Sequence, residues 1–132
     1  MGVELPAQPA LSLPAVAGGE WRAKAFGVEP LLLESAMELF IFARFHARPD
    51  QEGAVAEALR DVLGPSRQEA GCVSIHAFRS ISDAQLFYIH SRWKDEAAFD
   101  YHASLPHTVH FIDRVEPLID HPLDVTRAEL ID

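Results

Sequence analysis

From residue 37 onward, the apolar residues change their spacing in an order that few folds accommodate. Stretches with the two-residue period of a strand alternate with stretches that have the 3.6-residue period of a helix. Their order is strand, helix, strand, strand, helix, strand. This order predicts a ferredoxin-like α+β fold, in which one antiparallel sheet carries its helices on one face. The predicted strands span residues 37–47, 72–80, 85–93 and 123–131, and the predicted helical regions span 50–68 and 95–118, with an interruption at Pro106.

Short polar residues mark where several of these elements begin or turn. Pro49-Asp50 ends the first strand and offers Asp50 as an N-cap for the helix that follows. Ser82-Asp83 suits a hairpin turn, so we expect the second and third strands to pair antiparallel. Asp95 follows the third strand closely and is expected to cap the next helix.

Alternation along the strands separates two faces of the predicted sheet. One set of strand residues is almost entirely apolar, so we expect it to pack against the helices and form the core. Its members are Ile41, Ala43, Phe45, Val73, Ile75, Ala77, Phe87, Ile89, Ser91 and Trp93.

The opposite face combines large aromatic residues with arginines and histidines. This much aromatic area is unfavourable in water, so a second copy of the chain is expected to cover it, which predicts a homodimer. Histidines on neighbouring strands can also bind a metal. However, no carboxylate shares this face at ligand spacing and the arginines oppose a cation, so a polar seam in the dimer interface is the preferred interpretation. This outer face holds Phe40, Phe42, Arg44, His46, Ser74, His76, Phe78, Leu86, Tyr88, His90 and Arg92.

The chain after the third strand predicts a site for a small molecule. Trp93 ends the strand, and the helix capped by Asp95 carries His102 back towards it. Both side chains can therefore line one apolar pocket together with Ser91. The alternative is a core tryptophan and a hydrogen-bonded core histidine.

Three histidines in the last helical region also raise the question of a metal site. They are His102, His107 and His110. Pro106 breaks the helical spacing between the first two, so the sequence does not favour a shared metal, and none is expected.

Composition and missing motifs exclude several classes of function. The 132 residues carry a formal net charge of −9 and no Lys/Arg cluster, so neither nucleic acid nor an anionic membrane is an expected partner. No apolar run approaches the ~20 residues of a membrane span, and the N-terminus does not resemble a signal peptide. The single cysteine, Cys72, allows no intrachain disulfide and predicts a buried thiol in a cytoplasmic protein. Glycine-rich phosphate loops, CxxC and HExxH are all missing, so no flavin or nicotinamide site is expected.

Residues 1–36 differ from the rest of the chain. They contain four prolines and the pair Gly18-Gly19, and they show neither a helical nor a strand period. We interpret them as an N-terminal extension to the domain at 37–132. Trp21, Phe26 and the leucines at 31–33 could anchor such an extension as a strap over the domain or a partner.

Three short motifs in the patterned region resemble those of a known family. Glu69-Ala70-Gly71-Cys72 precedes the second strand, and Trp93-Lys94-Asp95 closes the third. Ala98 is then followed by His102 and Pro106-His107 in an Ala-x-x-x-His-x-x-x-Pro-His pattern. In order and spacing these motifs resemble the antibiotic biosynthesis monooxygenase family of dimeric α+β barrels.

The resemblance implies an enzyme that oxygenates electron-rich aromatics, such as quinols and polyketide phenols, without metal or flavin. Such substrates can donate electrons to oxygen themselves, so the protein needs only to bind them, favour deprotonation and exclude water. His102 is then the expected base or substrate partner, Trp93 the stacking wall and Ser91 a polar contact. His107 is a weaker candidate that orients the helix turn. The inner-face residues Ala43, Phe45 and Ile75 are expected to complete the substrate pocket.

The chain departs from the usual family pattern at two positions. Ile75 stands where members often have tyrosine, and Ser91 where they often have glutamate. Ala43 matches the position of an asparagine in haem-degrading relatives, which argues against haem degradation. These departures keep a second hypothesis open: a non-catalytic dimeric barrel that binds a small ligand or acts in stress responses, with its pocket filled by Ile75 and Phe45.

Overall fold

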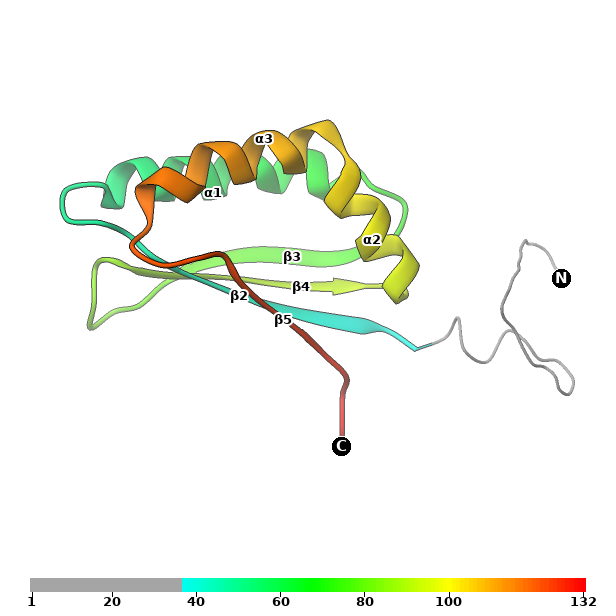
Figure 1. Ribbon diagram of the computed structural model, residues 1–132. Coiled ribbons are helices and arrows are strands. Elements are labelled where there is room, and N and C mark those ends of the chain that lie inside the picture. Colours follow the sequence, from blue (N-terminus) through cyan, green and yellow to red (C-terminus); the bar gives the residue numbers. More distant parts are fainter. Residues whose placement is uncertain (1–36) are drawn as a thin grey trace, which may run out of the picture. The chain divides into compact units, whose positions relative to one another are not determined.

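The computed structural model describes residues 37–132, which fold into a four-stranded antiparallel sheet with helices on one face (Figure 1). The strand order is β3-β4-β2-β5, so the predicted ferredoxin-like fold and element order are confirmed. The extension expected at 1–36 lies outside the described residues. The elements are β2 (Leu39–His46), α1 (Glu52–Arg67), β3 (Cys72–Arg79), β4 (Leu86–Trp93), α2 (Glu96–Ser104), α3 (Pro106–Val115), the short 3₁₀ helix η2 (Glu116–Leu118) and β5 (Asp124–Ala128).

The helix α1 packs on the sheet through one apolar stripe. Val55, Leu59 and Val62 are all buried, and their spacing places them on one helical face. They join the inner-face residues of the strands in a single core. In this part of the chain, no helix combines the length and the apolar character that a membrane crossing requires.

The two expected helix caps have different outcomes. The N-cap expected at Asp50 is wrong. Asp50 takes a left-handed φ of 69° in the turn after β2, and Gln51 occupies the N-cap position of α1 without a side-chain hydrogen bond. The cap expected at Asp95 is confirmed, because its Oδ1 accepts a hydrogen bond of 2.8 Å from the backbone N–H of Ala98.

The inner face of the sheet is apolar and buried as predicted, with one exception. Val73 is 46% exposed, because the register between β3 and β4 shifts between Cys72 and Ser74. Such a bulge takes one residue out of the alternation. Cys72 therefore pairs with Trp93 and packs against the core instead. Burial raises the pKa of the Cys72 thiol above its ordinary value, which keeps the thiol protonated and unreactive.

The outer face presents aromatic side chains, as expected. Phe42, Phe78 and Tyr88 are 50%, 52% and 39% exposed. The His90 ring stacks on Phe42 with their centroids 4.6 Å apart. These rings form an open aromatic surface on the single chain, on the side of the sheet away from the helices.

His46 ties the end of β2 to two other segments. Its Nδ1 lies 2.7 Å from Oδ2 of Asp120, and its Nε2 lies 3.3 Å from Oδ2 of Asp83. Both carboxylates lie in connections outside the strands, so they were not among the strand residues of the predicted outer face. The hydrogen bond to Asp120 is the main reason that the pKa of His46 is raised, and the same bond lowers the pKa of Asp120.

This pair gives folding stability a definite pH dependence. Folding raises the pKa of His46 above 6.5 and lowers that of Asp120 below 3.8. The contribution of His46 to folding stability is therefore fully present below pH 6.5 and is lost as pH rises through its raised pKa. The contribution of Asp120 is lost as pH falls through its lowered pKa. We expect His46→Gln to lower the melting temperature more at about pH 5 than at about pH 9, measured by thermal denaturation.

Asp120→Asn is the matched variant, because it removes the other half of the same hydrogen bond. It should show the same pH dependence, and combining it with His46→Gln should add little. If the difference in melting temperature between wild type and His46→Gln stayed constant across this pH range, the pH-dependent contribution of the His46–Asp120 pair would be contradicted.

Candidate functional site

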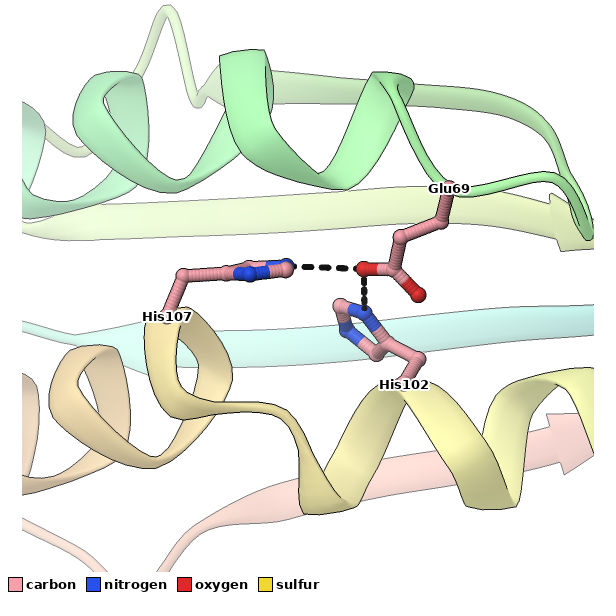
Figure 2. A group of neighbouring side chains, drawn as sticks. All are labelled: Glu69, His102 and His107. Atoms are coloured by element: carbon pink, nitrogen blue, oxygen red, sulfur yellow. Dashed lines mark hydrogen bonds and ion pairs between the residues drawn. The ribbon is translucent and has the colours of Figure 1, made fainter.

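Two histidines from separate segments converge on one carboxylate oxygen of Glu69 (Figure 2). Glu69 lies in the connection after α1, His102 in the last turn of α2, and His107 in the first turn of α3. The Nδ1 of His102 and the Nε2 of His107 each lie 2.7 Å from Oε2 of Glu69. In both hydrogen bonds the ring N–H donates to the carboxylate. The side chains of Glu69 and His102 in this Glu–His–His cluster are only 8% and 10% exposed, whereas that of His107 is 25% exposed.

The turn between α2 and α3 explains why the two histidines meet. Leu105 separates the helices with an extended backbone, at φ −77° and ψ 150°. Pro106 then starts α3, a position where its fixed φ suits a helix. The chain changes direction there, and the rings of His102 and His107 come to 5.9 Å between centroids. Pro106 does break the helical spacing, as expected, but the turn at Leu105 brings the two histidines together instead of separating them.

A close approach between backbone segments positions Glu69 beside α2. A Cβ built on Gly71 would lie 2.5 Å from the Cβ of Ala98 in α2, nearer than two carbon atoms can approach. Gly71 does not need a left-handed φ, so space alone demands glycine here. Its carbonyl oxygen also accepts a hydrogen bond of 2.9 Å from the backbone N–H of Lys94. The glycine and the alanine of the sequence motifs thus let the loop that carries Glu69 pack against the helix that carries His102.

Aromatic rings surround the imidazole of His102. Its centroid lies 4.4 Å from that of Trp93 and 5.6 Å from that of Phe99. Burial lowers the pKa of His102 below its ordinary value, although the hydrogen bond to Glu69 acts in the opposite direction. The neutral ring is therefore the expected form near pH 7.

The hydrogen bond to Glu69 leaves the second ring nitrogen of His102 available. Among the described residues, the buried side-chain polar atoms without a partner are Ser66 Oγ and Glu69 Oε1. The Nε2 of His102 has no hydrogen-bond partner among the described residues. A carboxylate that accepts the Nδ1–H fixes the tautomer and leaves a lone pair on Nε2, which can accept a proton. The hydroxyl of Thr108, 3.3 Å from Nδ1, completes the surroundings of this ring.

The predicted site residues fall into two groups. Trp93 lies beside His102 in the buried interior, and Ser91 is buried next to Trp93. The indole N–H of Trp93, which is fully buried, donates a hydrogen bond of 2.9 Å to the Ser91 hydroxyl. The second group packs in the hydrophobic core under α1 and α3, although Ile75 also pairs with Ser91 across the sheet. This group comprises Ala43, Phe45 and Ile75, which are 6%, 2% and 3% exposed.

Sequence reasoning did not identify Glu69 as a site residue. It appeared only as the first residue of a motif before the second strand. A usable signal was present, because β3 begins at the end of the sheet where β4 ends, with Cys72 opposite Trp93. A carboxylate three residues before Cys72 therefore lies at the same end as the helix that follows Trp93.

The chain is similar to proteins of one known family. The family model for antibiotic biosynthesis monooxygenase matches residues 39–114, which include all three residues of the Glu–His–His cluster. YcnE of Bacillus subtilis, described as a candidate monooxygenase, is 28% identical over 88 residues, covering 67% of this chain and 93% of YcnE. Rv0793 of Mycobacterium tuberculosis, described in the same way, is 31% identical over 86 residues, covering 65% of this chain and 84% of Rv0793.

Solved structures show the same fold. The structure of Rv0793 superposes with a TM-score of 0.68 at 28% identity, covering 72% of this chain and 96% of that one. The structure of PA3566 from Pseudomonas aeruginosa gives a TM-score of 0.69 at 28% identity, covering 74% of this chain and 98% of that one.

The contact between Gly71 and Ala98 leads to a stability test. Gly71→Ala should destabilise the protein by about 1–3 kcal/mol, the usual cost of overpacking, because the new methyl group meets the Ala98 methyl. Adding Ala98→Gly removes the clash, so the double variant should recover part of this loss even though glycine weakens α2. Urea denaturation of the two single variants and the double variant measures the coupling.

Gly53→Ala is the matched control, because a Cβ at Gly53 in α1 has no neighbour within 4 Å. This substitution should leave stability unchanged or raise it by up to about 1 kcal/mol. If Gly71→Ala were as well tolerated as Gly53→Ala, the close packing of α2 on the Glu69 loop would be excluded.

Proposed function

Because this chain belongs to the antibiotic biosynthesis monooxygenase family, we propose that it oxidises a small electron-rich aromatic, such as a quinol or a polyketide phenol, with O₂ and without metal or flavin. The observation that supports this activity is the pairing of Glu69 with His102 beside the aromatic rings of Trp93 and Phe99. It combines a proton acceptor with an apolar surface for a ring.

The residues of the site would each have a defined role. The substrate hydroxyl gives its proton to Nε2 of His102, and the Glu69 carboxylate stabilises the resulting imidazolium through the Nδ1–H. The second hydrogen bond to Glu69, from His107, holds the carboxylate in place. The substrate anion then supplies all four electrons that reduce O₂. One oxygen atom enters the substrate ring and the other leaves as water, so no external reductant is required.

Substrate binding requires α2 to move. Trp93 is fully buried, and Phe99 and His102 of α2 pack against it. The helix is also held to β5 by Arg127, which forms ion pairs of 2.9 Å with Glu96 and 2.8 Å with Asp100. Exposed ion pairs of this kind contribute little stability. We therefore propose that α2 shifts outward to admit the aromatic ring between itself and the sheet.

A second candidate function is a non-catalytic barrel that binds a small ligand or acts in stress responses. The observation that favours it is the filled inner face. Phe45 and Ile75 are 2% and 3% exposed, and the Ser91 hydroxyl already accepts the indole N–H. The two candidates differ in a measurable way, because only the first consumes oxygen.

We also propose that the active form is a homodimer joined through the outer face of the sheet. The half-exposed rings of Phe42 and Phe78 on that face support this assembly, since apolar area of this size is usually covered in a stable soluble protein. His90 and Arg92 would contribute the polar part of the interface.

Oxygen uptake by chelator-treated protein tests the enzymatic proposal directly. A panel of hydroquinones and anthrols serves as substrates, with autoxidation subtracted. We expect His102→Gln to lower the rate by about 10²–10⁴-fold, the usual contribution of a general base. Glu69→Gln should lower it by about 10–100-fold, because the ring loses the partner that orients it.

His110→Ala is the control, because it removes an exposed histidine from the same helix as His107. Its rate should equal that of wild type. Uptake that stays at the autoxidation rate on every substrate would exclude the monooxygenase and leave the ligand-binding candidate.

Sedimentation at micromolar concentration tests the dimer. We expect twice the chain mass of 14.6 kDa for wild type and the single mass for Phe42→Asp, which places a charge in the interface. Ile81→Asp is the matched control, because Ile81 is fully exposed on the β3–β4 hairpin and should not affect assembly. A wild-type protein with the mass of one chain would contradict the proposed interface.

A further inference from the structure

We propose that the Glu–His–His cluster is also a binding site for a divalent metal ion of the zinc type. The ligand atoms that Glu69, His102 and His107 offer all lie within 4.8 Å of one another. They come from the loop after α1, from α2 and from α3, so one ion would join three segments of the fold (Figure 2). This inference depends on geometry and does not require the proposed oxygenation.

The donor set determines which metals fit. Two imidazoles and one carboxylate form a borderline set that Zn²⁺ and Co²⁺ accept readily, whereas Mg²⁺ and Ca²⁺ prefer oxygen ligands throughout. The same combination of two histidines and one glutamate occurs in zinc sites that keep a further position open. A zinc-type ion is therefore the preferred occupant.

The carboxylate of Glu69 also has a buried oxygen atom without a partner in the described part of the chain. Oε1 of Glu69 is buried and has no hydrogen-bond partner among the described residues, while Oε2 accepts both histidine N–H groups. An unsatisfied buried acceptor is costly, and more so on an ionised carboxylate. The two imidazole N–H groups both bind the same oxygen atom and leave the other without a partner within residues 37–132. A bound cation would compensate the charge of the whole carboxylate.

Two of the three separations between ligand atoms are shorter than a zinc ion requires. Each histidine nitrogen lies 2.7 Å from Oε2 of Glu69. Around a zinc ion, with ligands at about 2.0–2.2 Å in tetrahedral geometry, neighbouring ligand atoms are about 3.3 Å apart. The two N–O separations would therefore widen by roughly half an ångström, while the two histidine nitrogens, which lie within 4.8 Å of each other, would settle at a similar spacing. The ion would replace the two hydrogen bonds to Glu69, and the proton of each neutral ring would move to its other nitrogen.

Metal binding would act on the chemistry of the site. Zinc is not redox-active, so it would not supply electrons to oxygen. It would occupy Nδ1 of His102 and replace the hydrogen bond to Glu69 that leaves Nε2 basic. We therefore expect the metal-bound form to be an inhibited state of the proposed enzyme.

Titration with Co²⁺ tests the site. The protein is the full chain, free of any affinity tag and stripped of metal with a chelator. We expect a visible absorption band of four- or five-coordinate Co²⁺ that saturates at one ion per chain and disappears when Zn²⁺ is added. His107→Ala and Glu69→Gln should each weaken Co²⁺ binding by at least about a hundredfold, the upper end of the loss caused by removing a supporting group alone.

Two controls keep the test decisive. His110→Ala should bind Co²⁺ as wild type does, and near-UV circular dichroism should show that Glu69→Gln and His107→Ala remain folded. The absence of a band in wild type, or a band that persists in both variants, would overturn the metal site. Neither outcome affects the proposed function, because that is tested by oxygen uptake of the metal-free protein.

Discussion

The candidate site depends on the hydrogen bonds that the buried carboxylate of Glu69 accepts. One of its oxygen atoms accepts hydrogen bonds from His102 and His107, and in doing so it joins the loop after α1 to α2 and α3. A buried carboxylate is costly unless it is paired, so the two histidines must stay close to it. The missing side chain at Gly71 makes this possible, because α2 could not otherwise approach the loop.

The two faces of the sheet differ in burial. The inner face forms the core with α1 and ends in Trp93, against which the ring of His102 packs. The outer face carries Phe42 and Phe78, half-exposed and outside the core. In the proposed dimer, a second copy of the chain would cover the outer face, while α2 would control access to the inner one. The proposed assembly and the proposed catalysis would then use different surfaces of the same four strands.

Sequence reasoning predicted the regular parts of this structure and failed where periodicity ends. Alternation and helical spacing predicted the βαββαβ order and the cap at Asp95, because both follow from local rules. Val73 was assigned to the wrong face because a bulge interrupts the alternation. Glu69 was missed because it lies in a connection, where no period indicates the direction of a side chain. The meeting of His102 with His107 depends on the extended backbone of Leu105, which helical spacing cannot predict.

The most direct test is a proton–nitrogen correlation spectrum of the histidine rings in the metal-free protein near pH 7. If Glu69 accepts an N–H from each ring, His102 must carry its proton on Nδ1 and His107 on Nε2. In Glu69→Gln these two tautomers should no longer be fixed, while the signals of His110 should stay unchanged. A spectrum in which His102 carries its proton on Nε2 and leaves Nδ1 bare would contradict the shared carboxylate.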